Sequence, residues 1–85
     1  MSGSETIDGL PEFQNEVDAS GLTCPLPILR AKKALAQMES GQVLRVTTTD
    51  PKAIRDFQAF AKQSGNSLIA QQEASDLVLH FLRRR

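Results

Sequence analysis

The sequence predicts an α/β fold, a two-layer sandwich in which two helices cover one face of a four-stranded mixed sheet. Two segments carry apolar residues at steps of three and four, which is the helical period. The segments around them alternate in polarity or are rich in β-branched residues, which favours strands. The resulting order is strand, helix, strand, helix, strand, strand. Each helix has one apolar stripe, so both can pack on the same face of the sheet.

The length and charge of the chain limit the classes of protein to which it belongs. Eighty-five residues make one small domain, near the size at which a single core is only just sufficient. The formal net charge is zero, and five acids precede the first base, Arg30. The remaining domain is only weakly basic, which does not favour binding to DNA. We expect a monomer or a weak oligomer.

The N-terminal part differs in composition from the rest. Residues 1–14 are polar and acidic with no sustained period, so we predict a flexible leader followed by a folded domain over 15–85. Leu10 and Phe13 are the leader residues that can pack on the domain. The chain has no apolar run of membrane-spanning length and does not begin like a signal peptide. A single cysteine cannot form an internal disulfide, which favours a cytoplasmic location.

The first helix is expected over residues 25–39, ending at Ser40-Gly41. Its predicted buried stripe is Ile28, Ala31, Ala34, Leu35 and Met38. At about 100° per residue, Leu26 and Leu29 fall on the opposite side, among Arg30 and Lys33. These four residues form either a docking patch for a partner protein or an ordinary solvated face with scattered leucines.

The remaining elements follow from similar signals. Strands are expected over 15–19, 42–49, 67–72 and 77–82, the last two as a hairpin. A right-handed crossover makes the first two strands parallel. The second helix is expected to have Asp50 as its N-cap and Pro51 in its first turn, and to end near residue 64. Its predicted buried stripe is Ala53, Ile54, Phe57, Phe60 and Ala61.

The last predicted strand is apolar on both sides. We expect the sheet face away from the helices to carry Val78, His80 and Leu82 or their in-register neighbours, covered by the leader or by a partner. His80 is the only histidine, and a structural role is favoured over a catalytic one. The tail at residues 83–85 is expected to be solvated, with contact to RNA or an acidic partner as the alternative.

The only cysteine, Cys24, lies in the segment Gly21-Leu22-Thr23-Cys24-Pro25-Leu26-Pro27. Pro25 suits a first helical turn and pushes the residue before it into an extended conformation. Cys24 is therefore predicted to be the N-cap, with its sulfur near the free N–H of Leu26. A helix start favours an anion, so the pKa of the thiol is expected to lie below its ordinary value of about 8.5. The alternative is an inert, buried cysteine.

The start of the second helix is expected to lie beside this cysteine. Parallel strand ends and the following helix starts share one edge of a sheet, which brings Asp50 near Cys24. The cap role of Asp50 is favoured over a role in receiving partners. No Cys/His cluster has metal-ligand spacing and no phosphate-binding glycine loop is present, so neither a metal nor a cofactor is expected.

The segment from Val17 to Pro27 resembles the signature of the TusA-like (SirA-like) sulfur-carrier family, and the resemblance extends over about residues 15–83. Cys-Pro-x-Pro opening the first helix is the specific part of it. The resemblance implies a persulfide on Cys24, with Pro25, Leu26 and Pro27 as the supporting turn. It also implies a donor protein, such as a cysteine desulfurase or a rhodanese-like protein, and an acceptor protein. In different branches of the family the sulfur serves tRNA 2-thiouridine synthesis, sulfur oxidation, molybdenum-cofactor supply or selenium metabolism.

One feature of the residues agrees with this resemblance. A persulfide carrier needs an exposed nucleophilic sulfur with no second thiol nearby, because a resolving cysteine would release the terminal sulfur. Two alternatives remain open. The same cysteine suits a peroxide-reactive or redox-sensing protein, and Leu26, Leu29 and their basic neighbours suit a protein-interaction module without chemistry of its own.

Overall fold

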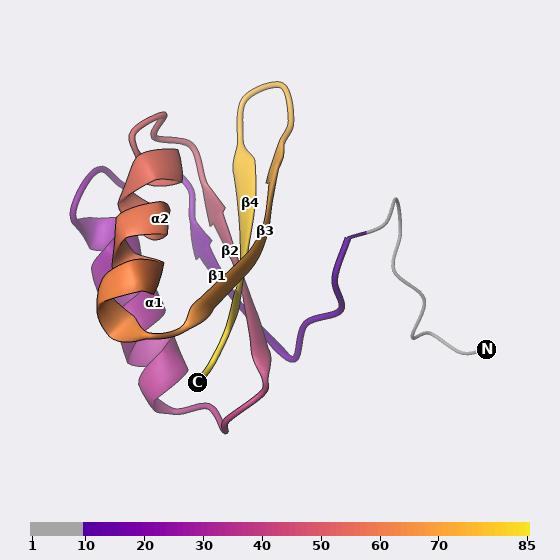
Figure 1. Ribbon diagram of the computed structural model, residues 1–85. Coiled ribbons are helices and arrows are strands. Elements are labelled where there is room, and N and C mark those ends of the chain that lie inside the picture. Colours follow the sequence, from indigo (N-terminus) through magenta and orange to yellow (C-terminus); the bar gives the residue numbers. More distant parts are fainter. Residues whose placement is uncertain (1–9) are drawn as a thin grey trace.

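The computed structural model describes residues 10–85, which form a four-stranded sheet with two helices packed on one of its faces (Figure 1). The strand order is β1-β2-β4-β3, with β1 parallel to β2 and the other two pairs antiparallel. The elements are β1 (Asn15–Ala19), α1 (Leu26–Ala36), β2 (Val43–Thr48), α2 (Ala53–Ser64), β3 (Ser67–Glu73) and β4 (Val78–Arg83). The predicted fold class, the parallel pair and the hairpin are confirmed.

The helix boundaries depart from the prediction at three ends. Helix α1 stops at Ala36, because the N–H groups of Gln37 and Met38 turn back to carbonyls only three residues earlier, at 3.1 Å each. Helix α2 begins at Ala53 rather than directly after Asp50. The N–H of Ala53 donates to the Asp50 carbonyl and that of Lys52 to Asp50 Oδ1, so Asp50 closes a turn that precedes the helix. It is not the N-cap. The start of α1 is described with the site below.

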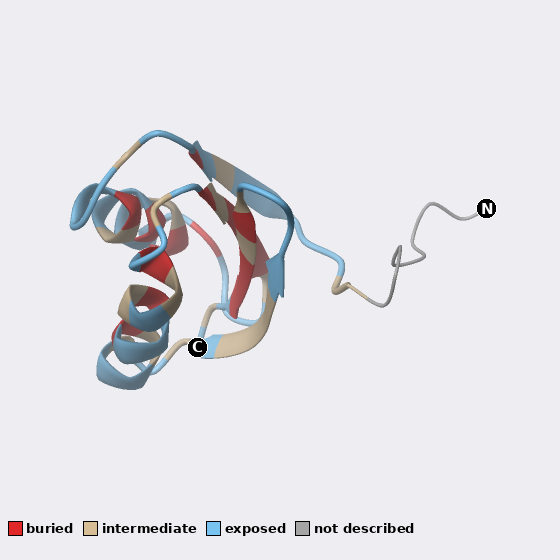
Figure 2. Cartoon of the chain, turned by 90° about the horizontal axis from the view of Figure 1, so that it is seen from above, coloured by how far each residue is buried: buried red, intermediate tan, exposed pale blue. Residues whose placement is uncertain are grey.

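The core lies between the helices and the sheet, where the buried residues gather (Figure 2). Both predicted helix stripes contribute to it, and Met38 remains buried although it lies beyond the end of α1. The fully buried core side chains include Ala19, Ala31, Leu44, Val46, Phe57 and Leu82. Ala34 and Ile28 pack at its margin.

His80 and Leu82 of β4 face the helices, not the outer face of the sheet where they were first expected, so the expected alternative of their neighbours on the outer face is the correct one. His80 stacks on Phe57 of α2, with ring centroids 4.4 Å apart, and Leu82 belongs to the core between sheet and helices. The alternate residues of β4, including Phe81, therefore occupy the outer face. Both faces of β4 are apolar, so the pattern of the strand alone does not determine which one meets the helices.

The outer face of the sheet is covered by the end of the predicted leader. Phe13 packs on Phe81 with centroids 6.4 Å apart, and the Arg45 guanidinium lies 4.2 Å from the centre of the Phe13 ring. Arg45 also forms an ion pair with Glu16. The N–H of Gln14 donates to the Val43 carbonyl, and Gln14 Oε1 accepts the Val43 N–H at 2.8 Å. Phe13 and Gln14 thus belong to the folded unit, and residues 1–9 of the predicted leader lie outside the described residues.

The C-terminal segment is also packed. Arg84 exchanges backbone hydrogen bonds with Gly41 and Gln42, and its Nε donates to the Leu35 carbonyl at 2.8 Å. Arg83 and Arg85 are exposed, as expected for a solvated tail, whereas Arg84 is half-buried and its bonds tie the segment to the loop after α1 and to Leu35. Over residues 10–85, neither helix is both long and apolar enough to cross a membrane.

Candidate functional site

The turn that carries Cys24 is held from outside by the β2–α2 connection. The N–H of Gly21 donates to Thr49 Oγ1 at 2.8 Å, and the N–H of Cys24 donates to Asp50 Oδ2 at 3.2 Å. Gly21 has φ of +79°, a conformation that glycine adopts without strain. The predicted approach of Asp50 to Cys24 is confirmed, and both segments meet at the upper end of the molecule in Figure 1.

The start of α1 differs from the sequence prediction. The residue before the helix is Pro25, not Cys24, and no side chain caps the helix. The N–H of Leu26 donates to the Thr23 carbonyl at 2.8 Å, so it is not free to bind the sulfur. The peptide bond between Cys24 and Pro25 is cis. Cys24 is exposed, so the alternative of a buried cysteine is wrong.

The charges around the thiol oppose its ionisation. The Asp56 carboxylate, which hydrogen-bonds to the thiol and repels the thiolate, raises the pKa of Cys24 above its ordinary value. Partial desolvation and the charge of Asp50 act in the same direction, and Lys52 acts against them. The expected lowering of the Cys24 pKa is therefore wrong. Its physical basis, an anion at a free helix start, is missing because Thr23 already occupies the Leu26 N–H.

Asp50 is committed to holding the backbone. Its Oδ2 accepts the Cys24 N–H and its Oδ1 accepts the Lys52 N–H, and these bonds lower the pKa of its carboxyl. A carboxylate with both oxygens bonded to backbone supports the structural role over the role in receiving partners.

The proposed docking residues share the exposed face of α1. Leu26 and Leu29 are 45% and 51% exposed, and they are the two large apolar side chains of the helix that remain in water. Arg30 and Lys33 are exposed beside them. We name these four residues the α1 patch. Leu26 is two residues from Cys24, so the patch begins at the thiol.

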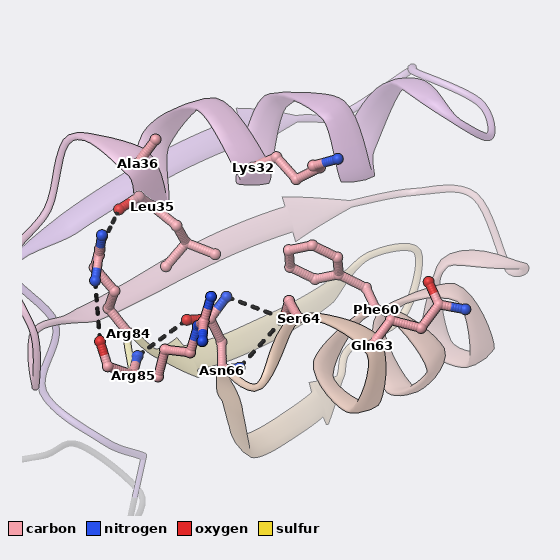
Figure 3. Close-up of a pocket in the computed structure, with 9 residues that line it drawn as sticks. All are labelled: Lys32, Leu35, Ala36, Phe60, Gln63, Ser64, Asn66, Arg84 and Arg85. Carbon is pink, nitrogen blue, oxygen red and sulfur yellow. Dashed lines mark hydrogen bonds between the residues drawn. The ribbon is translucent and has the colours of Figure 1, made fainter.

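Two of the hollows formed by residues 10–85 border the helices, one beside the start of α2 and the other at the C-terminal ends of both helices. One of about 390 Å³ is lined by Lys52, Arg55, Asp56 and Ala59, and so shares Lys52 and Asp56 with the surroundings of the thiol. The other, of about 270 Å³, lies between α1, α2 and the C-terminal segment, with Phe60 and Arg84 among its lining residues (Figure 3). This second hollow does not include Cys24. Among residues 10–85, no group of His, Cys, Asp and Glu side chains is arranged to bind a metal ion.

Comparison with known proteins identifies the family. A family model described as Sulfurtransferase TusA matches residues 15–84. The chain belongs to the TusA family. It is 55% identical over 76 residues to the sulfur carrier protein TusA of Allochromatium vinosum, an alignment that covers 89% of this chain and 99% of that protein. It is 58% identical over 57 residues to a putative sulfur carrier protein of Neisseria meningitidis, covering 67% of this chain and 77% of the other.

A solved structure agrees with the family assignment. The crystal structure of a SirA-like protein from Desulfitobacterium hafniense superposes with a TM-score of 0.73 at 28% sequence identity, covering 82% of this chain and 96% of that one. The two-layer α/β architecture is therefore that of the family.

Sequence reasoning did not find the groups that set the acidity of the thiol. Asp56 lies thirty-two positions after Cys24, and in sequence it reads as an ordinary acidic residue in the first turn of a helix. Lys52 lies in the turn before that helix. The only available signal was the predicted meeting of the two helix starts, which places everything in the first turn of α2 near the cysteine.

Proposed function

We propose that this protein is a sulfur carrier that accepts a sulfane sulfur on Cys24 as a persulfide and passes it to an acceptor protein. The observation that carries the proposal is an exposed, single cysteine on a turn whose backbone is held by hydrogen bonds to the side chains of Thr49 and Asp50. Membership of the TusA family and the names of its relatives support the same role. The donor and acceptor are proteins, because a carrier has to meet two different active sites in turn.

The uptake step is a transfer of one sulfur atom without net oxidation. The Cys24 sulfur attacks the outer sulfur of a persulfide on the donor. A new S–S bond forms at Cys24 while the S–S bond of the donor breaks, and the electrons of that bond leave on the donor's inner sulfur. The proton lost by the Cys24 thiol balances the proton gained by the donor thiol. The number of thiols and of persulfides is unchanged.

The electrostatics of the site place a condition on this step. Only the thiolate attacks, and Asp56 raises the pKa of Cys24, so in the free carrier the thiol is predominantly protonated at pH 7. A persulfide is a stronger acid than the parent thiol, so the loaded carrier ionises more readily than the empty one. We expect the thiolate for uptake to form within the complex with the donor.

Docking is assigned to the α1 patch. A complex that must form and separate twice per cycle is expected to be small and steered by charge, which speeds encounter more than it tightens binding. Leu26 and Leu29 offer apolar area next to the thiol, and Arg30 and Lys33 offer the charge. Carriage to tRNA thiolation or to sulfur oxidation, and a location in the cytoplasm, are the contexts proposed from the family.

The test is incubation with a cysteine desulfurase and cysteine, followed by mass spectrometry of the intact protein. A gain of one sulfur atom that is removed by a reductant and absent in Cys24→Ser supports the proposal. The Cys24→Ser control should fold normally, since Cys24 is exposed. No gain of sulfur from a desulfurase or from a rhodanese-like donor would contradict it.

The two alternatives give different products in the same assay. A peroxide-reactive protein gains oxygen at Cys24 when treated with peroxide, and a module without chemistry gains neither atom. The raised pKa of Cys24 argues against efficient reaction with peroxide, because that reaction also requires the thiolate.

A further inference from the structure

A chain of polar side chains runs through the interior and links four elements. Gln58 Nε2 donates to Gln71 Oε1 at 3.1 Å, and Gln71 Nε2 donates to the Ile54 carbonyl at 3.0 Å. Gln71 Nε2 also lies 3.0 Å from His80 Nδ1, and His80 Nε2 lies 2.8 Å from Thr48 Oγ1. His80 and Thr48 are 0% exposed. Four groups on α2, β3, β4 and β2 are thereby joined in series.

In this series of side chains, each hydrogen bond is donated in the same direction, from Gln58 toward Thr48. The amide oxygen of Gln71 is taken by Gln58, so its nitrogen faces the imidazole. Nδ1 of His80 must then accept, which places the proton of the neutral ring on Nε2. Nε2–H donates to the hydroxyl oxygen of Thr48. The series therefore ends on Thr48, the last residue of β2.

The surroundings keep His80 neutral. Phe57 stacks on the ring from α2, Gln71 faces it from β3 and Thr48 from β2, and all three are uncharged. Burial lowers the pKa of His80 to about 4. If Nδ1 carried a proton as well, it would face the N–H of Gln71 as a second donor, and the hydrogen bond between them would be lost. At neutral pH the series of hydrogen bonds from Gln58 to Thr48 is thus intact.

Thr48 is followed directly by the two residues that hold the cysteine turn. Thr49 accepts a backbone N–H from that turn and Asp50 accepts the N–H of Cys24. We propose that His80 is a positioning residue for Cys24: its bond to Thr48 fixes the end of β2, and so fixes the two acceptors that hold the thiol in place. The link to catalysis rests on the proposed sulfur transfer, whereas the link to the geometry of the turn does not.

The test replaces Thr48 by valine, which keeps the shape and removes the hydroxyl. The Nε2–H of His80 is then buried without a partner, and the end of β2 is free to shift. We expect hydrogen exchange at the Gly21 and Cys24 amides, followed by NMR, to become roughly tenfold faster, the equivalent of about one hydrogen bond. Sulfur uptake from a persulfidated donor should slow as well.

Two variants separate positioning from a general loss of stability. Val43→Ala removes buried volume at the opposite end of β2, away from the cysteine turn, and its loss of stability is measured by urea unfolding alongside that of Thr48→Val. It should leave exchange at Gly21 and Cys24 and the uptake rate close to those of the unmodified protein. Thr48→Ser keeps the hydroxyl and should restore both readouts.

The outcomes are distinct. Equal effects of Thr48→Val and Val43→Ala on the two amides, or no effect of Thr48→Val, would overturn the positioning role. If Thr48→Val does not fold, Gln58→Ala decides. It removes the hydrogen-bond partner of Gln71 Oε1 and so weakens the hold on the Gln71 amide that faces His80; faster exchange at the same amides supports the role, whereas unchanged exchange contradicts it. Changed exchange in a protein that never takes up sulfur would retain the positioning role and reject the proposed function.

Discussion

At the scale of single residues, the acidity of Cys24 is set by side chains that its own segment does not contain. Cys-Pro-x-Pro correctly indicated an exposed, positioned cysteine. It did not predict the sign of the pKa shift, because that sign depends on Asp56 and Lys52 of the second helix region. Electrostatic effects act through space over a few ångströms, and a local motif carries no information about such neighbours.

Replacing Asp56 by asparagine should lower the pKa of Cys24. The substitution removes the carboxylate that hydrogen-bonds to the thiol, which is the largest cause of the raised pKa, and with it the repulsion of the thiolate. The pH profile of alkylation by iodoacetamide should shift to lower pH, with faster reaction at pH 7 than in the unmodified protein. Glu39→Gln, the same loss of charge at an exposed position beyond the far end of α1, should leave the profile unchanged. An unshifted profile in Asp56→Asn would remove Asp56 from the account of the site.

At the scale of elements, the helices and strands follow the sequence closely, and the errors lie at their ends. Hydrophobic period identifies the stripe of a helix, but not whether its last turn closes on carbonyls three or four residues back. The same limit applies to Asp50, which forms the predicted bond to a nearby backbone N–H yet stands outside α2. The exposed face of α1 was predictable, since Leu26 and Leu29 stand off the buried stripe.

Reversing the charges of the α1 patch should slow sulfur transfer between proteins. In Arg30→Glu/Lys33→Glu, the attraction that steers the partner becomes repulsion, and we expect about a tenfold slower transfer at low ionic strength, with a smaller difference at high salt. The measurement is the transfer rate from a persulfidated donor against salt concentration.

The control for this double variant reverses two exposed charges elsewhere, in Lys62→Glu/Arg83→Glu. Its transfer rate should stay near that of the unmodified protein at each salt concentration. Identical salt profiles for the two double variants would move the docking surface away from α1.

Phe13 is expected to contribute to stability although it precedes the first strand. It covers Phe81 and receives the Arg45 guanidinium, so Phe13→Ala should lower the free energy of unfolding by about 1–2 kcal/mol. Urea unfolding followed by circular dichroism measures this loss. Leu29→Ala, which removes a more exposed side chain, should change it by less than about 0.5 kcal/mol. If Phe13→Ala leaves the free energy of unfolding unchanged, the packing of Phe13 on the outer face of the sheet does not contribute to stability.

At the scale of the whole molecule, connectivity rules predicted the architecture, whereas the facing of β4 was left undecided. The right-handed crossover and the hairpin together account for the parallel pair β1–β2 and the antiparallel pair β3–β4. A strand that is apolar on both sides satisfies either orientation. In the orientation observed, His80 meets hydrogen-bond partners on other strands, buried Thr48 and half-buried Gln71, which the pattern of β4 alone does not reveal.

The stability of the molecule should fall in mildly acidic solution because of His80. Its pKa is lowered to about 4 in the fold from an unfolded value of 6.5, so the unfolded chain binds the proton more readily between these values. The contribution is fully present above pH 6.5 and is lost as the pH falls to about 4, a total of about 3 kcal/mol. Asp18 and Asp50, whose carboxyl pKa values are lowered, add their losses only at still lower pH.

Urea unfolding between pH 7 and pH 4 measures this dependence, and NMR titration of the His80 ring gives its pKa directly. His80→Gln, which keeps hydrogen-bonding capacity without titrating, should flatten the slope between pH 6.5 and pH 4. A slope that persists unchanged in this variant would assign the dependence to other groups.

The bonds that hold the cysteine turn also decide how this site can be transplanted. A protein engineer who copies only Gly21 to Pro27 onto the start of a helix in another scaffold transfers the cysteine but not the side-chain oxygens of Thr49 and Asp50 that accept the N–H groups of its turn. The graft would sample many orientations and lose the geometry. The smallest portable unit is therefore a pair of segments, the cysteine turn and the β2–α2 connection, mounted on two adjacent parallel strands.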